Sequence, residues 1–180
     1  MPAYVSLFKG INVGGNHQVK MADLKALHES LGLTDVLPYI QSGNVVFKSE
    51  DTDPTHLRQQ IEESFETTFG FRSAVMLRSL ADLQAIIDTN PFQNHPDKEP
   101  KWIAVMFLSN SPDETARQAL LTSYNGPEEI HITGQNMYIY YPDGVGRSKL
   151  TTPLIEKKLK TIGTGRNWNT VLRLQTLLSR

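Results

Sequence analysis

Three segments of the sequence combine glycine with basic side chains where a helix is expected to begin. They are Lys9-Gly10-Ile11-Asn12-Val13-Gly14-Gly15, Gly144-Val145-Gly146-Arg147-Ser148-Lys149 and Thr164-Gly165-Arg166-Asn167-Trp168-Asn169. Glycine permits a positive φ angle, and the free backbone N–H groups at the start of a helix attract anions. Lysine adds positive charge, and the arginine guanidinium can hold a phosphate through paired hydrogen bonds. The three segments together predict a site for a phosphate-type anion.

The first segment has two interpretations. Lys9 and Lys20 flank its glycines, which favours an anion cradle before the following helix. The spacing G-x-x-x-G-G matches neither the P-loop nor the dinucleotide-binding fingerprint, so the alternative is a tight turn that needs glycine for its backbone. The candidate ligand-binding residues in this part of the chain are Lys9, Asn12, Gly14, Gly15, Lys20, Ser42 and Asn44.

The second and third segments are equally open to two interpretations. An arginine beside a tryptophan can hold the phosphate and the ring of a nucleotide. In the alternative, Arg147 and Lys149 are solvated, Trp168 packs into the core, and an asparagine caps the last helix. The candidate ligand-binding residues here are Arg147, Ser148, Lys149, Arg166, Asn167, Trp168 and Asn169.

Apolar runs and helical periodicity predict the elements that position the first segment. Strands are expected at residues 3–8, 33–40, 44–48 and 71–77, and helices at 21–31, 54–69 and 79–88. Pro38 indicates an edge strand or a bulge, and Gln41-Ser42-Gly43-Asn44 is typical of a hairpin turn. The order βαββαβ predicts a ferredoxin-like antiparallel sheet with two helices on one face.

Residues 90–97 are rich in proline and polar side chains and give the best domain boundary, so we expect domains at 1–89 and 90–180. Beyond the boundary, the pattern predicts a strand at 102–108, a helix at 111–123, a hairpin of 128–132 with 136–141, and helices at 151–162 and 167–178. Gly163, Thr164 and Gly165 separate those two helices. The recurrence of βαββ predicts a structural duplication and an α+β fold with two ferredoxin-like halves.

Composition limits the chemistry. The 180 residues include no cysteine, which excludes disulfides, thiolate nucleophiles and cysteine metal sites. The five histidines lack metal-ligand spacing, and the adjacent pair Glu128-Glu129 suits solvated surface, so no metal or cofactor is expected.

Residues 144–180 carry eight Lys and Arg against one Glu, a net charge of +7, whereas the first 143 residues carry −8. A basic end of this kind predicts an anionic partner or docking against the protein's own acidic surface.

Five blocks of the sequence resemble the successive signature blocks of a bacterial family, domain of unknown function 1697 (DUF1697). The blocks are Lys9-Gly10-Ile11-Asn12-Val13-Gly14-Gly15, Tyr39-Ile40-Gln41-Ser42-Gly43-Asn44-Val45-Val46-Phe47, Asn90-Pro91-Phe92, Arg147-Ser148-Lys149-Leu150 and Arg166-Asn167-Trp168-Asn169-Thr170-Val171. The resemblance implies an α+β protein of ferredoxin-like halves and no established activity. Two positions depart from the family pattern, since Lys9 replaces its usual arginine and Gly165 its usual threonine. Both changes weaken a ligand role at those positions.

The sequence favours a small protein that binds a nucleotide or single-stranded nucleic acid. The binding site is expected where the regions of Gly14, Lys149 and Arg166 converge. The N-terminal residues lack a signal peptide and no apolar run reaches the ~18 residues of a membrane span, so we expect a cytoplasmic location and no membrane partner. Open sheet edges make a monomer or a homodimer plausible.

Two alternatives come from other functional classes. One is an enzyme acting on a phosphorylated small molecule, with Ser42, Ser148 or His17 moving protons. The other is a structural or partner-binding module without a ligand, in which the glycine segments serve as turns.

Overall fold

The computed structural model describes residues 1–40 and 42–180, so Gln41 of the first hairpin turn lies outside the described residues. The chain divides into two compact units, Met1–Ala85 with Arg173–Arg180, and Ile86–Leu172. The division falls within the helix that precedes the expected boundary, and it assigns the last eight residues to the first unit. No helix in the described part of the chain is long and apolar enough to cross a membrane.

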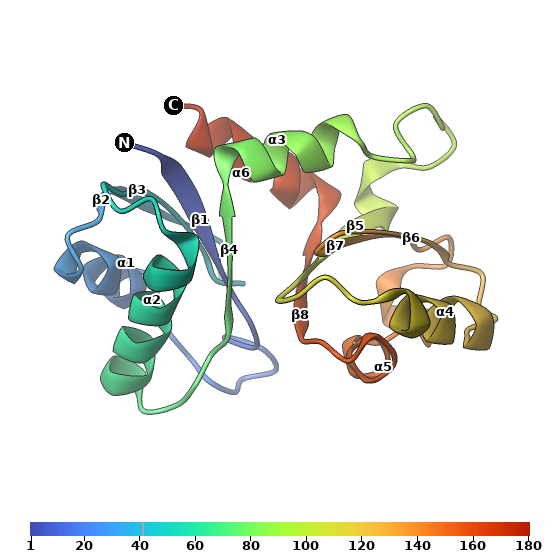
Figure 1. Ribbon diagram of the computed structural model, residues 1–180, viewed down its shortest axis with the longest axis horizontal. Helices are drawn as coiled ribbons and strands as arrows, with labels where there is room; N and C mark the ends of the chain where they lie inside the picture. Colours follow the sequence, from blue (N-terminus) through green and yellow to red (C-terminus); the bar gives the residue numbers. More distant parts are fainter. Residues whose placement is uncertain (41) are drawn as a thin grey trace. The chain divides into compact units, whose positions relative to one another are not determined.

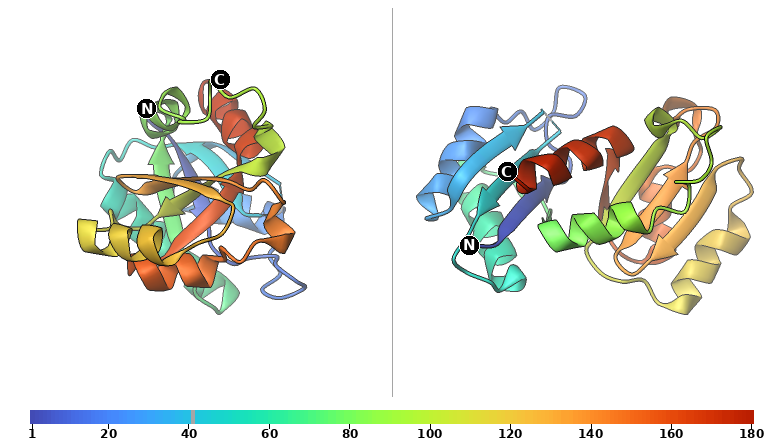
Figure 2. Two further views of the ribbon diagram at one scale, coloured as in Figure 1. Left: turned by 90° about the vertical axis from the view of Figure 1, so that its right-hand side faces the viewer. Right: turned by 90° about the horizontal axis from the view of Figure 1, so that it is seen from above.

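The first unit is an antiparallel sheet with two helices on one face (Figures 1 and 2). Its elements are β1 (Ala3–Phe8), α1 (Met21–Ser30), β2 (Thr34–Tyr39), β3 (Asn44–Lys48), α2 (Pro54–Phe69), β4 (Val75–Ser79) and α3 (Leu80–Asp88). The strand order is β2-β3-β1-β4, and all three pairs are antiparallel. This confirms the predicted ferredoxin-like order for the first half.

Local sequence signals account for these elements. Alternate residues of β1 and β3, such as Phe8 and Phe47, join Leu24 and Phe65 of the two helices in one buried cluster. Asp53 caps α2 by accepting hydrogen bonds from the backbone N–H groups of the second and third residues after it. β2 is an edge strand whose register shifts between Thr34 and Leu37, as the proline in that strand predicts.

The second unit repeats this plan. Its elements are β5 (Ile103–Leu108), α4 (Glu114–Ser123), β6 (Glu129–Thr133), β7 (Asn136–Tyr140), α5 (Thr152–Leu159), β8 (Gly163–Asn167) and α6 (Trp168–Leu178). The strand order β6-β7-β5-β8 matches that of the first sheet position by position. Helices α4 and α5 contact each other and pack on one face of the sheet (Figure 1). The structural duplication is therefore confirmed.

Strand β8 corrects one expectation, since Gly163, Thr164 and Gly165 belong to a strand and do not form a connection between two helices. In the structure these residues pair with Met106–Leu108 of β5. A Cβ atom at Gly163 would lie 2.9 Å from Leu108 Cδ2 and 3.0 Å from the Phe107 carbonyl oxygen. The close approach of the neighbouring strand requires glycine there, although glycine is rare in strands. The second half is thus βαββαβα rather than βαββ followed by helices.

Candidate functional site

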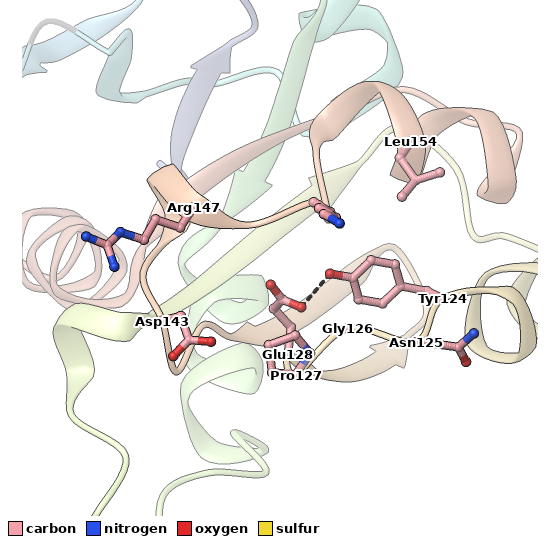
Figure 3. Close-up of a pocket in the computed structure, with 9 residues that line it drawn as sticks. Tyr124, Asn125, Gly126, Pro127, Glu128, Asp143, Arg147 and Leu154 are labelled. Atoms are coloured by element: carbon pink, nitrogen blue, oxygen red, sulfur yellow. Dashed lines mark hydrogen bonds between the residues drawn. The ribbon is translucent and has the colours of Figure 1, made fainter.

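The second unit contains a cavity of about 540 Å³ beside the basic segment around Lys149. It lies between the turn that follows α4 and the loop that joins β7 to α5 (Figure 3). Its lining residues are Tyr124, Asn125, Gly126, Pro127, Glu128, Asp143, Arg147, Lys149 and Leu154. We call this the large cavity.

Glu128 is the inner carboxylate of the large cavity, and both of its oxygens already accept hydrogen bonds. The Tyr124 hydroxyl donates to Oε2 at 2.5 Å, as Figure 3 shows, and the Ser148 hydroxyl donates to Oε1 at 2.6 Å. Burial raises the pKa of the Glu128 carboxyl, but the hydrogen bonds from Ser148 and Tyr124 lower it more, so the net pKa lies below its usual value. Glu128 is therefore ionised at neutral pH and already satisfied.

The same network raises the pKa of Tyr124 to about 12, through burial and the hydrogen bond to Glu128. A carboxylate with a lowered pKa is a weak base, and a tyrosine with a raised pKa is a poor nucleophile near pH 7. The arrangement is suited to binding polar groups more than to moving protons. Among the described residues, no cluster of three or more histidine, aspartate or glutamate side chains is placed to hold a metal ion.

The basic side chains of the large cavity differ from Glu128 because they lack protein partners. Neither Arg147 nor Lys149 makes an ion pair or a side-chain hydrogen bond with a described residue, and both are exposed. In Figure 3 Arg147 extends away from the Tyr124–Glu128 pair, at the rim of the cavity. Asp143 also borders the cavity, so the lining carries two cations, Arg147 and Lys149, and two anions, Asp143 and the hydrogen-bonded Glu128.

The loop that carries these cations is held by its own backbone and by Ser148. Gly144 adopts φ +83°, and a Cβ atom there would lie 3.4 Å from the Trp102 ring. Residues Val145–Arg147 form one turn of 3-10 helix, and the Ser148 hydroxyl accepts the Leu150 N–H at 3.0 Å. Ser148 therefore positions the loop against Glu128 and is not free to bind a ligand through its proton.

The side chains of the third glycine segment are mostly buried or hydrogen-bonded within the protein. The Arg166 guanidinium is 6% exposed and donates to Thr164 Oγ1 and the Gly165 carbonyl, and burial lowers its pKa to about 10. Asn167 accepts the Asn169 N–H at 2.9 Å and donates to the Lys101 carbonyl at 3.0 Å, so it caps α6.

Trp168 is 6% exposed, and the Asn169 side chain is exposed. The helix cap and the buried tryptophan are the features that the structural interpretation of this segment expects, and ligand binding by Arg166, Asn167, Trp168 and Asn169 stays a prediction.

A second cavity of about 270 Å³, the small cavity, lies on the same unit. It is lined by Lys101, Trp102, Ile103, Ala104, Met106, Ile139, Tyr141, Val145, Thr152, Gly165, Arg166 and Asn167. Lys149 and Arg166 thus border two different cavities in one unit. Gly14 belongs to the other unit, and its convergence with them stays a prediction.

In the first unit, the glycine segment folds into a small hairpin. Gly14 and Gly15 have φ angles of +57° and +79°, and Val13 accepts the Asn16 N–H at 2.9 Å, which forms the tip. The Asn12 side chain accepts the Val19 N–H at 2.7 Å and donates to the Val19 carbonyl at 3.1 Å, so it closes the base of the loop.

Helix α1 begins at Met21, after this hairpin, with Lys20 at its N-cap and no side-chain cap. Lys9 is half-buried, and its carbonyl accepts the Ser73 hydroxyl at 2.8 Å. Asn44 is fully buried and donates to the Tyr39 carbonyl and to the exposed Ser42 hydroxyl. Ligand binding by these residues of the first unit stays a prediction.

Sequence reasoning missed Tyr124, Glu128 and Asp143 as cavity residues. Glu129 is exposed and pairs with Lys98, as expected for solvated surface, but its neighbour Glu128 turns inward to two hydroxyl groups. The Gly126-Pro127 dipeptide signals a turn after α4, yet nothing in it indicates that this turn faces the basic loop.

Comparison with known proteins supports the fold and names no ligand. The sequence model of a family described as protein of unknown function (DUF1697) matches residues 1–138. The fold is similar to the solved structure of a conserved bacterial protein from Streptococcus pneumoniae, with a TM-score of 0.77, 25% identity and 98% of each chain covered. No curated protein matches the chain.

Proposed function

The chain belongs to the DUF1697 family of proteins of unknown function, and from its site we propose that the second unit binds a mononucleotide, with the phosphate held at the large cavity. The observation that carries the proposal is the charge state of the lining. Arg147 and Lys149 have no ion-pair partner among the described residues, whereas the inner carboxylate Glu128 is satisfied by two hydroxyl donors. A phosphate neutralises the two cations without disturbing that network.

Size favours one nucleotide over a nucleic-acid strand. The volume of about 540 Å³ lies within the roughly 300–1,000 Å³ of sites for small ligands. A strand needs an extended basic groove with several stacking platforms. Asp143 and Asn125 line the same cavity and supply polar groups for sugar hydroxyls.

Binding is favoured over catalysis because of the protonation states. Near pH 7 the Tyr124 hydroxyl keeps its proton and Glu128 stays ionised, as the directions of their pKa shifts require. Ser148 donates its only proton to Glu128 and accepts a backbone N–H, so that proton is already used in a hydrogen bond.

Calorimetric titration with AMP, adenosine and ribose 5-phosphate tests the proposal. We expect Lys149→Ala to weaken AMP binding about tenfold or more, since a hydrogen bond to a charged group contributes roughly 1.5–3 kcal/mol. Arg147→Ala should have a smaller effect, because Arg147 lies at the rim. Lys157→Ala is the matched control, since Lys157 is an exposed base of the following helix α5, outside the cavity lining.

Two results would count against a mononucleotide site. One is AMP binding that is equal in the native protein and in Lys149→Ala. The other is binding of single-stranded oligonucleotides that is tighter than AMP binding, strengthens as the strand is lengthened and weakens as salt is added, which indicates a strand-binding surface instead.

A further inference from the structure

The small cavity contains polar groups that the protein itself does not satisfy. Tyr141 lines the cavity and is 5% exposed, yet its hydroxyl has no hydrogen-bond partner among the described residues. The Trp102 indole N–H and the Thr152 hydroxyl also lack partners there. Among the described residues, only Arg117 Nε and Asn136 Oδ1 are buried side-chain atoms without a hydrogen bond, so the Tyr141 hydroxyl is open to the cavity and available to a ligand or to solvent.

The floor of the small cavity is apolar. It is the face of the second sheet that carries Met106 and Ile139, and Gly165 leaves this face uncovered because it has no side chain. A Cβ atom at Gly165 would lie 3.6 Å from Met106 Cε, an ordinary contact, so a larger side chain would extend into the cavity rather than clash with the strand. An apolar floor with polar groups at the edge suits a heterocyclic ring.

One wall of the small cavity is an aromatic face. Trp102 is half-buried, and the Lys101 ammonium lies 5.1 Å from its ring centroid. Aromatic side chains bind planar rings by stacking, which contributes about 1–3 kcal/mol for a base. The volume of about 270 Å³ is below the range of sites that enclose a whole small ligand, so the cavity suits a ring rather than a complete nucleotide.

The two cavities share one loop. Tyr141 and Val145 line the small cavity, whereas Asp143, Arg147 and Lys149 line the large one. Glu128 and Tyr124 of the large cavity lie close enough to Tyr141 to add to the rise that burial causes in its pKa. The loop therefore separates two adjoining spaces, one with an apolar floor and one bordered by the unpaired bases Arg147 and Lys149.

We propose that the small cavity is the ring-binding subsite for the same mononucleotide, with the base held at Trp102 while the phosphate lies at Lys149. This inference rests on the proposed function and adds the recognition of the ring. It also assigns a role to Gly165, whose missing side chain keeps the subsite open.

The experiment follows tryptophan fluorescence during titration with AMP, adenosine and ribose 5-phosphate. The chain has two tryptophans, so Trp102→Phe isolates the signal of the cavity wall. We expect AMP and adenosine, but not ribose 5-phosphate, to change the emission of the native protein, and Trp102→Phe to lose this change.

Filling the subsite provides a second measurement. Gly165→Val should weaken AMP binding about tenfold or more and leave ribose 5-phosphate binding unchanged. Thr133→Val is the matched control, since Thr133 is an exposed strand residue of the same sheet outside the cavity lining. Thermal unfolding of each variant verifies folding, and Thr152→Val tests the same cavity from α5 if Gly165→Val folds poorly.

The outcomes separate the two proposals. AMP binding that depends on Lys149 but is unaffected by Gly165→Val and Trp102→Phe overturns the ring subsite and keeps the phosphate site. AMP binding that depends on Gly165 but not on Lys149 supports a ring site and overturns the phosphate site. Failure of AMP and adenosine to bind at all overturns both.

Discussion

The buried side chain of His28 makes the stability of the fold depend on pH. The imidazole in α1 is fully buried, donates to the Leu24 carbonyl at 2.8 Å and accepts from the Ser6 hydroxyl at 3.1 Å. The rings of Phe8 and Phe47 lie 5.9 and 5.4 Å away. Burial lowers the pKa of His28 to about 4, with the bond to Leu24 opposing the shift.

This predicts acid sensitivity with a defined sign. The unfolded chain, with a histidine pKa of about 6.5, binds a proton before the folded state does, so stability falls as the pH drops from about 6.5 to 4. The full loss is about 3 kcal/mol, since each pKa unit is about 1.4 kcal/mol. Urea unfolding at pH 7.5, 6, 5 and 4 should show this loss in the native protein and a flatter profile in His28→Gln.

His95→Gln serves as the control because His95 is exposed, and it should keep the native profile. Equal pH profiles for the native protein and His28→Gln would show that His28 does not cause the acid sensitivity.

At the scale of elements, β8 and α6 meet at Asn167, which links the strand, the helix and the Lys101 backbone. Loss of an N-cap side chain costs about 0.5–2 kcal/mol, so Asn167→Ala should lower the free energy of unfolding by about 1 kcal/mol. Asn169→Ala should change it little, because no hydrogen bond of its exposed side chain to a described residue is found. Chemical denaturation of both variants measures the difference. A larger loss in Asn169→Ala than in Asn167→Ala would contradict the assigned cap.

The segment around Asn167 also shows what sequence can and cannot predict. An Arg-Asn-Trp run before a helix is chemically suited both to a ligand and to a helix cap, and the choice depends on burial, which the local sequence does not encode. Strand β8 was missed for a related reason, since Gly163 reads as a turn until the approach of β5 is known. The long apolar strands and periodic helices were predicted because each carries its own pattern.

The candidate site was predicted in part. The basic loop at Lys149 could be recognised from glycine, charge and the helix that follows. Its cavity partners Tyr124 and Glu128 come from a turn some twenty residues earlier, and no local signal joins the two segments. Only the tertiary fold brings them together.

At the scale of the whole molecule, the duplication extends from topology to individual positions. In each unit the fourth strand places a buried arginine opposite a valine of the first strand, Arg78 with Val5 and Arg166 with Val105. Burial lowers the pKa of each guanidinium to about 10, and an N-cap residue follows each arginine directly. The same buried arginine occurs in a unit that lacks the basic loop. This recurrence favours a structural role for Arg166.

The chain is not a simple tandem of two halves, since Arg173–Arg180 belong to the first unit. Within that unit Arg180 donates to the Asp35 carbonyl at 2.6 Å, and Gln175 donates to Gln84 at 2.9 Å. Leu174 is fully buried in this segment. The C-terminal residues should therefore stabilise the N-terminal sheet.

Leu174→Ala tests this arrangement. Removing a buried leucine side chain costs about 2–5 kcal/mol, and we expect the loss of hydrogen-exchange protection to be greatest in peptides from Met1–Ala85. Leu172→Ala is the control, because Leu172 is 37% exposed and belongs to the second unit. Exchange that increases only in Ile86–Leu172 would contradict the assignment of the C-terminal residues. Exchange that increases first in the N-terminal sheet would show that the first unit needs both ends of the chain, so this unit is completed only after the second unit has been synthesised.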